Sequence, residues 1–274
     1  LNWMLYTSLF AAICATGLCM ATERLLIAAI PPLFTALHAL VLGSTLVVYN
    51  AHYIIKKARP NTSDRYAWTE KNRYWHFIFF IGGAAICIAS LFWLSWKILL
   101  GCVVLGFLSF AYSIPLLPFE NKKRIRDFGW IKITVLTSVW TIVTSVLPTL
   151  YWDKPWTAYP YEILIRFVFM FTLCVAFDIR DMQTDLNSEI FTLPNLIGLK
   201  NSYRLMDLTL MLFVILCTIQ YVRYPSGTRL TGELITAIVT KVAINYTKQH
   251  SSDRVYLGLI DGMMLLYAIL VLWH

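Results

Sequence analysis

Long apolar blocks separated by short polar stretches make up most of the chain. Each block is about 20 residues long, enough for a helix to cross a hydrocarbon layer of about 30 Å. The pattern predicts about nine transmembrane helices, at residues 3–22, 26–48, 76–96, 98–117, 131–150, 160–178, 205–222, 231–246 and 255–273. The eighth block is the weakest, because Glu233, Lys241 and Asn245 interrupt it. We therefore expect an all-α, polytopic membrane protein with a single domain over residues 1–274.

Composition supports a membrane protein and excludes several other classes. Of the 274 residues, 58% are hydrophobic and 14% are charged, whereas a soluble domain of this length needs more polar surface. The six cysteines stand singly in apolar blocks, which is typical of small hydrophobic residues and not of a disulfide framework or metal site. The chain begins at Leu1, and what precedes it is left open. A cleavable signal is not expected, since the first block continues through Glu23 and Arg24 into the next.

The distribution of Lys and Arg predicts the orientation, because basic loops stay in the cytoplasm. Most of the 23 Lys and Arg residues follow the second, fourth, sixth and eighth blocks. The opposite face keeps Arg24, Lys97, Lys154, Arg166, Arg223 and Arg229. We therefore expect a cytoplasmic N-terminus, an external C-terminus and a site that faces the cytoplasm. The net charge of +8 belongs mostly to these loops and favours anionic lipid over nucleic acid as a contact.

The strongest chemical signal is the acidic triplet Asp178, Asp181 and Asp185 at the end of the sixth block. Steps of three and seven residues place the carboxylates in one narrow sector of a helix, so they are expected to aim at one point. Three carboxylates at a membrane rim repel one another unless a cation compensates them, and oxygen ligands favour Mg²⁺ bridged to a phosphate group. The alternative is a solvated helix extension in which Arg180 is an ion-pair partner.

Two segments resemble the UbiA superfamily of intramembrane prenyltransferases. Residues 177–185, followed by Thr192-Leu-Pro and Gly198, resemble the second aspartate motif of that superfamily. Tyr112-Ser-Ile-Pro, followed by a basic cluster, resembles the Tyr-Ser-x-Pro segment after its fourth helix. The resemblance implies that an isoprenyl diphosphate is bound through Mg²⁺ held by two aspartate motifs, and that the prenyl group passes to a lipid-soluble acceptor within the membrane.

The chain departs from this pattern in the first motif. When Asn50 is aligned with the Asn of Asn-Asp-x-x-Asp-x-x-x-Asp, the positions of the three acids hold Ala51, Ile54 and Ala58. Basic residues nearby could contact phosphate oxygens in place of a metal, or could simply be positive-inside residues. Lys56 and Lys57 are the nearest of them.

The resemblance assigns residues to a candidate site. Asp178, Asp181 and Asp185 would hold Mg²⁺ and carry catalysis. The diphosphate-binding residues would be Asn50, Lys56, Lys57, Tyr112, Lys122 and Arg180. Several have a plainer interpretation: Asn50 could make an interhelical hydrogen bond, Tyr112 could be an interfacial anchor, and Lys122 could be a topology signal. Asp261, in the last block, is expected to pair internally.

The leading hypothesis is prenyl transfer from a polyprenyl diphosphate to an aromatic or other lipid-soluble acceptor, with no protein partner indicated. A second hypothesis is a catalytically inactive UbiA-like protein that binds a lipid phosphate or polyprenyl chain, which the missing first motif favours. A transporter is less consistent with the sequence, because paired Gly- or Pro-broken spans are missing. A cyclase that ionises the same substrates is a variant of the first hypothesis.

Overall fold

The computed structural model describes residues 2–27, 29–55, 64–113, 129–187 and 190–273, without the side chains of 109–113. All secondary structure in these ranges is helical. The long helices are α2 (Leu9–Ile27), α3 (Ala36–Ile55), α5 (Arg73–Leu91), α6 (Trp96–Ser113), α7 (Gly129–Thr141), α9 (Pro160–Leu186), α11 (Leu199–Arg223), α12 (Gly227–Thr247) and α14 (Asp261–Leu272). The short ones are α1 (Asn2–Tyr6), α4 (Asp64–Lys71), the π-helix η2 (Ile142–Val146), α8 (Leu147–Tyr151), the 3₁₀-helix η3 (Trp156–Ala158), α10 (Leu193–Ile197), α13 (Asp253–Val255) and the π-helix η4 (Tyr256–Ile260).

A helix lies at each of the nine predicted segments in the described part of the chain. Among the described residues, six helical segments are long and apolar enough to cross a membrane. The other three predicted spans are α6, α9 and α12. The last two carry buried charged residues within the apolar run, among them Glu162, Arg166 and Glu233. The prediction of an all-α, polytopic membrane protein is confirmed.

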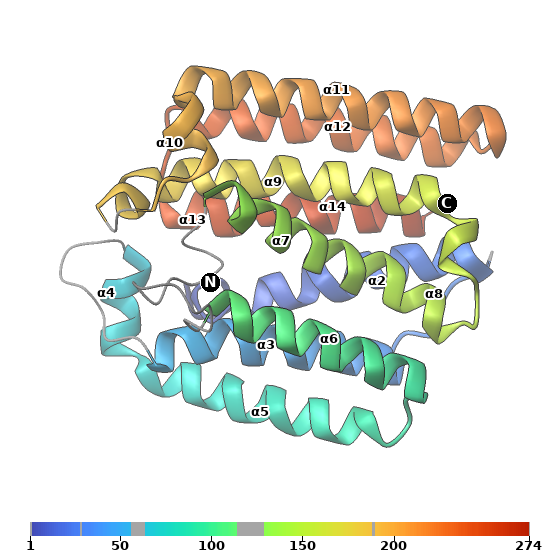
Figure 1. Ribbon diagram of the computed structural model, residues 1–274, viewed down its shortest axis with the longest axis horizontal. Coiled ribbons are helices and arrows are strands. Elements are labelled where there is room, and N and C mark those ends of the chain that lie inside the picture. Colours follow the sequence, from blue (N-terminus) through green and yellow to red (C-terminus); the bar gives the residue numbers. More distant parts are fainter. Residues whose placement is uncertain (1, 28, 56–63, 114–128, 188–189, 274) are drawn as a thin grey trace.

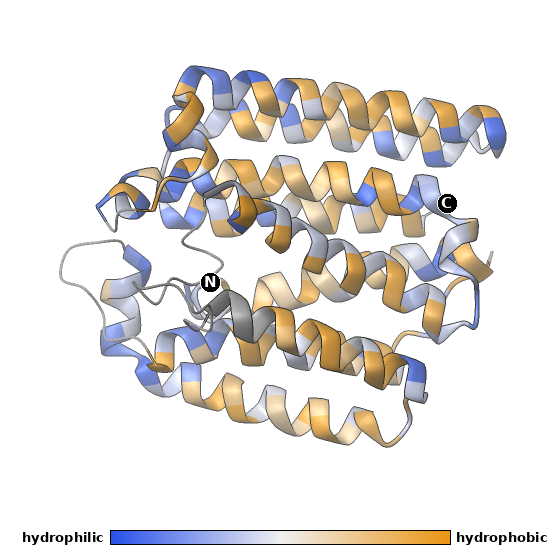
Figure 2. Cartoon of the chain, viewed as in Figure 1, coloured by the Kyte–Doolittle hydropathy of each residue, from blue (hydrophilic) through white to orange (hydrophobic). Residues whose placement is uncertain are grey.

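The long helices form one bundle whose ends differ in character. In Figure 1, α9 lies between the α11–α12 pair and α7, with α14 behind it; α2 lies between α14 and the group formed by α3, α5 and α6. Figure 2 shows hydrophobic residues along the helices, and many hydrophilic residues near α4, α10 and the end of α9. We call the end of the bundle with α4, α10 and α13 the polar end.

The helices α3 and α5 approach each other most closely through two glycines. A Cβ atom on Gly43 would lie 2.7 Å from the backbone oxygen of Gly83, and one on Gly83 would lie 2.8 Å from the oxygen of Gly43. Both distances are shorter than any normal contact, so a larger residue would separate the helices. Small residues at such crossings are typical of membrane bundles, where close backbone packing replaces the hydrophobic drive between helices.

The core lies around α9. Phe169 of α9 packs against Phe213 of α11 and Tyr267 of α14, with ring centroids 5.5 Å and 5.4 Å apart. By contrast, large apolar side chains of α5 such as Phe77 and Ile81 are exposed. An apolar outer surface over a packed core is expected of helices that face lipid.

Candidate functional site at the polar end of the bundle

The acidic triplet lies in the last turns of α9, at the polar end of the bundle (Figure 1). α9 has 27 residues and is therefore about 40 Å long, more than the hydrocarbon thickness of about 30 Å. Its final turns extend beyond the predicted span, which ends at residue 178. The helix continues through Asp185 to Leu186, as the spacing of the acids predicts.

Lys132 of α7 connects two of the three carboxylates. Its Nζ atom lies 2.9 Å from Oδ1 of Asp178 and 2.6 Å from Oδ2 of Asp185. Asp178 is only 5% exposed, and its other oxygen, Oδ2, is buried without a hydrogen-bond partner in the described structure. Lys132 has no role in the site predicted from the sequence. Its position among the first residues of an apolar block, where a charge needs a partner, was the available signal.

The third carboxylate, Asp181, pairs with Arg180. The Nε and Nη2 atoms of Arg180 donate to Oδ1 and Oδ2 of Asp181 at 2.7 and 2.9 Å, a bidentate pair. Nη1 of Arg180 lies 4.0 Å from Oδ1 of Asp253, and the guanidinium packs over the ring of Phe177. Burial alone would raise the pKa of Asp181, but the Arg180 guanidinium holds it below its usual value.

The three carboxylates therefore do not aim at one point, which corrects the expectation from spacing. Asp178 and Asp185 share Lys132, whereas Asp181 faces Arg180. At 100° per residue, three residues leave Asp181 about 60° away from Asp178 around the helix, while Asp185 is only about 20° away. No group of three His, Cys, Asp or Glu side chains within the described ranges is arranged to hold a metal ion.

Asn50 belongs to a sealed hydrogen-bond network at the same end. It is 0% exposed. Its Nδ2 donates to the backbone oxygens of Thr7 and Leu46 at 2.9 and 2.8 Å, and its Oδ1 lies 2.7 Å from Nδ1 of His76. Nε2 of His76 lies 3.1 Å from the hydroxyl of Thr69. The amide thus joins Thr7, just after α1, to α3 and α5, and His76 extends the network to α4. The contact of Asn50 with a diphosphate stays a prediction.

The remaining predicted site residues are only partly visible. Lys56, Lys57 and Lys122 lie outside the described residues. Tyr112 lies in the last turn of α6, where only the backbone is described.

Arg65 of α4 is a site residue that sequence reasoning missed. It is 6% exposed, and its guanidinium donates to the backbone oxygen of Tyr6 at 3.0 and 2.8 Å and to the hydroxyl of Ser8 at 2.7 Å. Its backbone N–H donates to Oδ2 of Asp253 at 2.9 Å, and its guanidinium lies 4.4 Å from the centre of the Tyr53 ring. Asp253 therefore links Arg65 to the Arg180 pair described above.

These contacts involve four carboxylates and three cations. The carboxylates belong to Asp178, Asp181, Asp185 and Asp253, and the cations to Lys132, Arg180 and Arg65. The buried oxygen of Asp178 that has no hydrogen-bond partner in the described structure leaves a position at which a cation could bind. The cations around it are donors suited to phosphate oxygens.

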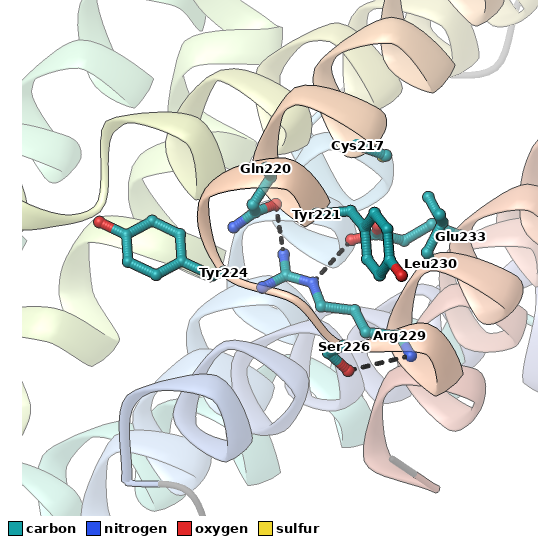
Figure 3. A pocket seen from close by; sticks show the side chains of 8 residues that line it. All are labelled: Cys217, Gln220, Tyr221, Tyr224, Ser226, Arg229, Leu230 and Glu233. Carbon is teal, nitrogen blue, oxygen red and sulfur yellow. Dashed lines mark hydrogen bonds and ion pairs between the residues drawn. The ribbon is translucent and has the colours of Figure 1, made fainter.

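A second buried ionic network lies near the opposite end, between α9, α11 and α12. Arg229 contacts Glu162 at 2.5 Å, Glu233 at 2.9 Å and Gln220 at 2.8 Å. Figure 3 shows its guanidinium beside Gln220 and Glu233 in a small pocket. The cavity measures about 10 Å³, which is at most room for one water molecule. We interpret this network as structural.

The chain was compared with protein families, curated proteins and solved structures. No model of a protein family matches the chain, and none of the curated proteins matches it. Solved structures do. A UbiA homologue from Archaeoglobus fulgidus bound to GPP and Mg²⁺ has a TM-score of 0.67 at 12% identity, over all of both chains. The same homologue bound to Cd²⁺ gives 0.63, also at 12% identity and over all of both chains.

A structure of digeranylgeranylglyceryl phosphate synthase in membranes has a TM-score of 0.56 at 14% identity, over 100% of this chain and 98% of that one. At identities this low, the structural match establishes a shared fold and nothing more. The chain has the fold of these UbiA homologues along its whole length.

Proposed function

We propose that the chain is a divergent member of the UbiA superfamily that binds an isoprenyl diphosphate at the polar end and transfers its prenyl group to a lipid-soluble acceptor. The observation that carries this proposal is the convergence of Asp178 and Asp185, at 2.9 and 2.6 Å from one cation, in a fold whose solved relative holds GPP and Mg²⁺. The positive-inside pattern supports placing this end in the cytoplasm.

The donor set fits one Mg²⁺ ion. Two carboxylates that both reach a single Lys132 Nζ atom are close enough to share a cation, and the Oδ2 atom of Asp178 is buried without a partner. Mg²⁺ commonly binds to one or two carboxylates and completes its shell with water and substrate phosphate. Asp178 and Asp185 would hold the ion, which supplies positive charge that stabilises the departing diphosphate. Asp181 would hold the guanidinium of Arg180 in place, and Arg180 would contact the diphosphate.

The chain's own cations would take the part that the resemblance to the superfamily assigns to the first aspartate motif, whose acids are missing here. Lys132 and Arg180 are fixed by the acids they contact, so their charges are in place before a diphosphate arrives. Preorganised charge of this kind stabilises a leaving group without reorganisation. Lys56, Lys57, Tyr112 and Lys122 remain proposed diphosphate contacts.

A measurement of diphosphate release tests the proposal. Purified protein in detergent is incubated with Mg²⁺ and a panel of isoprenyl diphosphates, and free diphosphate is quantified. We expect release that requires Mg²⁺ and falls by about a hundredfold or more in Asp178→Asn. The matched control is Asp207→Asn, since Asp207 also pairs with a lysine, Lys241, but at an exposed site. The control is expected to act like the wild type.

An inactive lipid-phosphate-binding protein is the second candidate, favoured by the absence of Asp and Glu from residues 49–63. It predicts tight binding of an isoprenyl diphosphate that does not require Mg²⁺, with no diphosphate release across the panel. That result would refute the transferase proposal.

A further inference from the structure

Asp261 is a buried carboxylate in the membrane-spanning part that the site described above does not use. It is 7% exposed, at the first residue of α14, directly after the π-helix η4. π-helical turns inside longer helices occur frequently at functional sites, because they redirect the side chains that follow. The sequence led us to expect that Asp261 pairs internally. Its carboxylate instead makes no hydrogen bond or ion pair with any residue that the structure describes.

This sets Asp261 apart from the other buried acids of the described residues. Glu23 lies 2.7 Å from Nε2 of His38, while Glu162 and Glu233 both contact Arg229. Asp178, as shown above, contacts Lys132. A carboxylate without a partner at membrane depth is costly, and such residues are functional candidates by default.

The surroundings of Asp261 place it inside the bundle, below the acidic triplet. Its charge acts on Cys14 of α2, Tyr49 of α3 and Cys174 of α9. Cys174 lies within electrostatic range of Asp178 as well. On α9, Cys174 precedes Asp178 by four residues, which is about 6 Å along the axis. The ring centre of Tyr256, the first residue of η4, is 5.9 Å from the Arg180 guanidinium, and Asp261 follows Tyr256 by five residues, so Asp261 lies deeper in the membrane than Arg180.

The neighbours of Asp261 include groups that could orient a polar acceptor. Tyr49 and Trp140 are only partly buried although they stand on the inner helices α3 and α7. Asp261 lies within electrostatic range of the guanidinium groups of Arg180 and Arg65, which belong to the polar end. Arg180 and Arg65 therefore lie toward the proposed diphosphate site, and Asp261 lies on the side of these cations that faces the middle of the membrane.

We propose that Asp261 is a catalytic residue that accepts the proton given up by the acceptor during prenyl transfer, an inference that rests on the proposed function. In this step the bond between the prenyl C1 atom and the diphosphate oxygen breaks, and its electron pair leaves with the diphosphate. An acceptor oxygen or ring carbon forms the new bond to C1. The proton displaced from that atom moves to the Asp261 carboxylate. A carboxylate held beside the acceptor accepts this proton more effectively than a water molecule that is not held in position.

Two variants separate this role from the rest of the reaction. In Asp261→Asn the shape is kept and the base is removed, whereas Asp261→Glu keeps a base. With geranyl diphosphate, Mg²⁺ and a panel of lipid-soluble phenols and alcohols, we expect the Asn variant to retain diphosphate release, with prenyl alcohol as the product. Transfer to the acceptor should fall by about 10² to 10⁴-fold. The Glu variant should recover part of the transfer.

The outcomes distinguish failure of this inference from failure of the proposed function. Wild-type transfer that Asp261→Asn leaves unchanged, or release and transfer that fall by the same factor, would overturn the role of Asp261 alone. A wild type that releases no diphosphate would overturn both.

A labelling experiment on the wild type guards against a variant that fails to fold. Dicyclohexylcarbodiimide modifies carboxyl groups in apolar surroundings, and modified peptides are identified by mass spectrometry. We expect Asp261 to be labelled and geranyl diphosphate with Mg²⁺ to slow the labelling at least severalfold. Absence of labelling, or labelling at the same rate with ligand bound, would show that Asp261 does not lie beside the bound substrate.

Discussion

Replacing Lys132 by Met removes the cation between two carboxylates and keeps a side chain of similar length. Lys132 is 13% exposed at its side chain, Asp178 is 6% exposed and Asp185 is 15% exposed, so solvent screens the charges only weakly. Each charge-assisted contact is worth about 1.5–3 kcal/mol, and breaking a buried pair from one side costs about 3–5 kcal/mol. We therefore expect Lys132→Met to lose about 3–5 kcal/mol of stability without divalent ions.

The same variant should respond more strongly to Mg²⁺ than the wild type. Without Lys132, the two carboxylates repel each other, and an added cation restores the balance. Mg²⁺ at 100 times its Kd stabilises the folded state by about 2.7 kcal/mol. In the wild type, the ion must first compete with the ammonium group for the same oxygens, so its effect should be smaller.

Thermal unfolding in detergent, with and without Mg²⁺, measures both effects. Lys132→Arg should unfold close to the wild type, because it keeps the charge. Lys97→Met is the matched control, since Lys97 contacts Asp153 at 2.6 Å but both side chains are largely exposed, and such pairs contribute little. If Lys132→Met unfolds at the wild-type temperature, or if Mg²⁺ stabilises both proteins equally, the assignment of Asp178 and Asp185 as a cation-binding pair is wrong.

Three further predictions concern other parts of the bundle. Asn50→Leu should destabilise the protein by about 1–3 kcal/mol in thermal unfolding, because it leaves buried groups unpaired; a loss of diphosphate affinity at unchanged stability would instead support a ligand role. Gly43→Ala should lower the yield of folded protein in gel filtration, whereas Gly82→Ala should not, since a Cβ atom there meets nothing within 4 Å. Because Arg180 lowers the pKa of Asp181, their pair should stabilise the protein above the ordinary pKa of Asp181 and lose this effect as the pH falls through the lowered value. Unfolding measured against pH should show a shallower acid limb in Asp181→Asn.

The helices of this protein could be predicted from the sequence because their signal is local. A run of about 20 apolar residues has to become a helix in a membrane, where every backbone N–H and C=O group needs a partner within its own segment. The two interrupted blocks, at α9 and α12, were found for the same reason. Their charges, Glu162, Arg229 and Glu233, are buried against one another.

The site was predicted less completely, because its contacts join residues from different helices. Spacing placed Asp178 and Asp185 on one face of α9, and in the structure both contact Lys132. It could not identify that partner, because Lys132 lies on α7 and reads as one more basic residue near a loop. Likewise, the sequence left open whether Asn50 binds a ligand or makes an interhelical hydrogen bond, and in the structure its Oδ1 atom lies 2.7 Å from Nδ1 of His76 on α5.

The sequence by itself therefore determined the helical segments and which residues share a face, since helical geometry fixes both within a few turns. Only the tertiary structure decided which faces meet. That choice depends on how closely the helices approach and how they rotate about their axes, which distant contacts such as the one between Gly43 and Gly83 set. Packing of this kind brings Lys132 to Asp178, and it leaves the Asp261 carboxylate without a hydrogen-bond or ion-pair partner among the described residues.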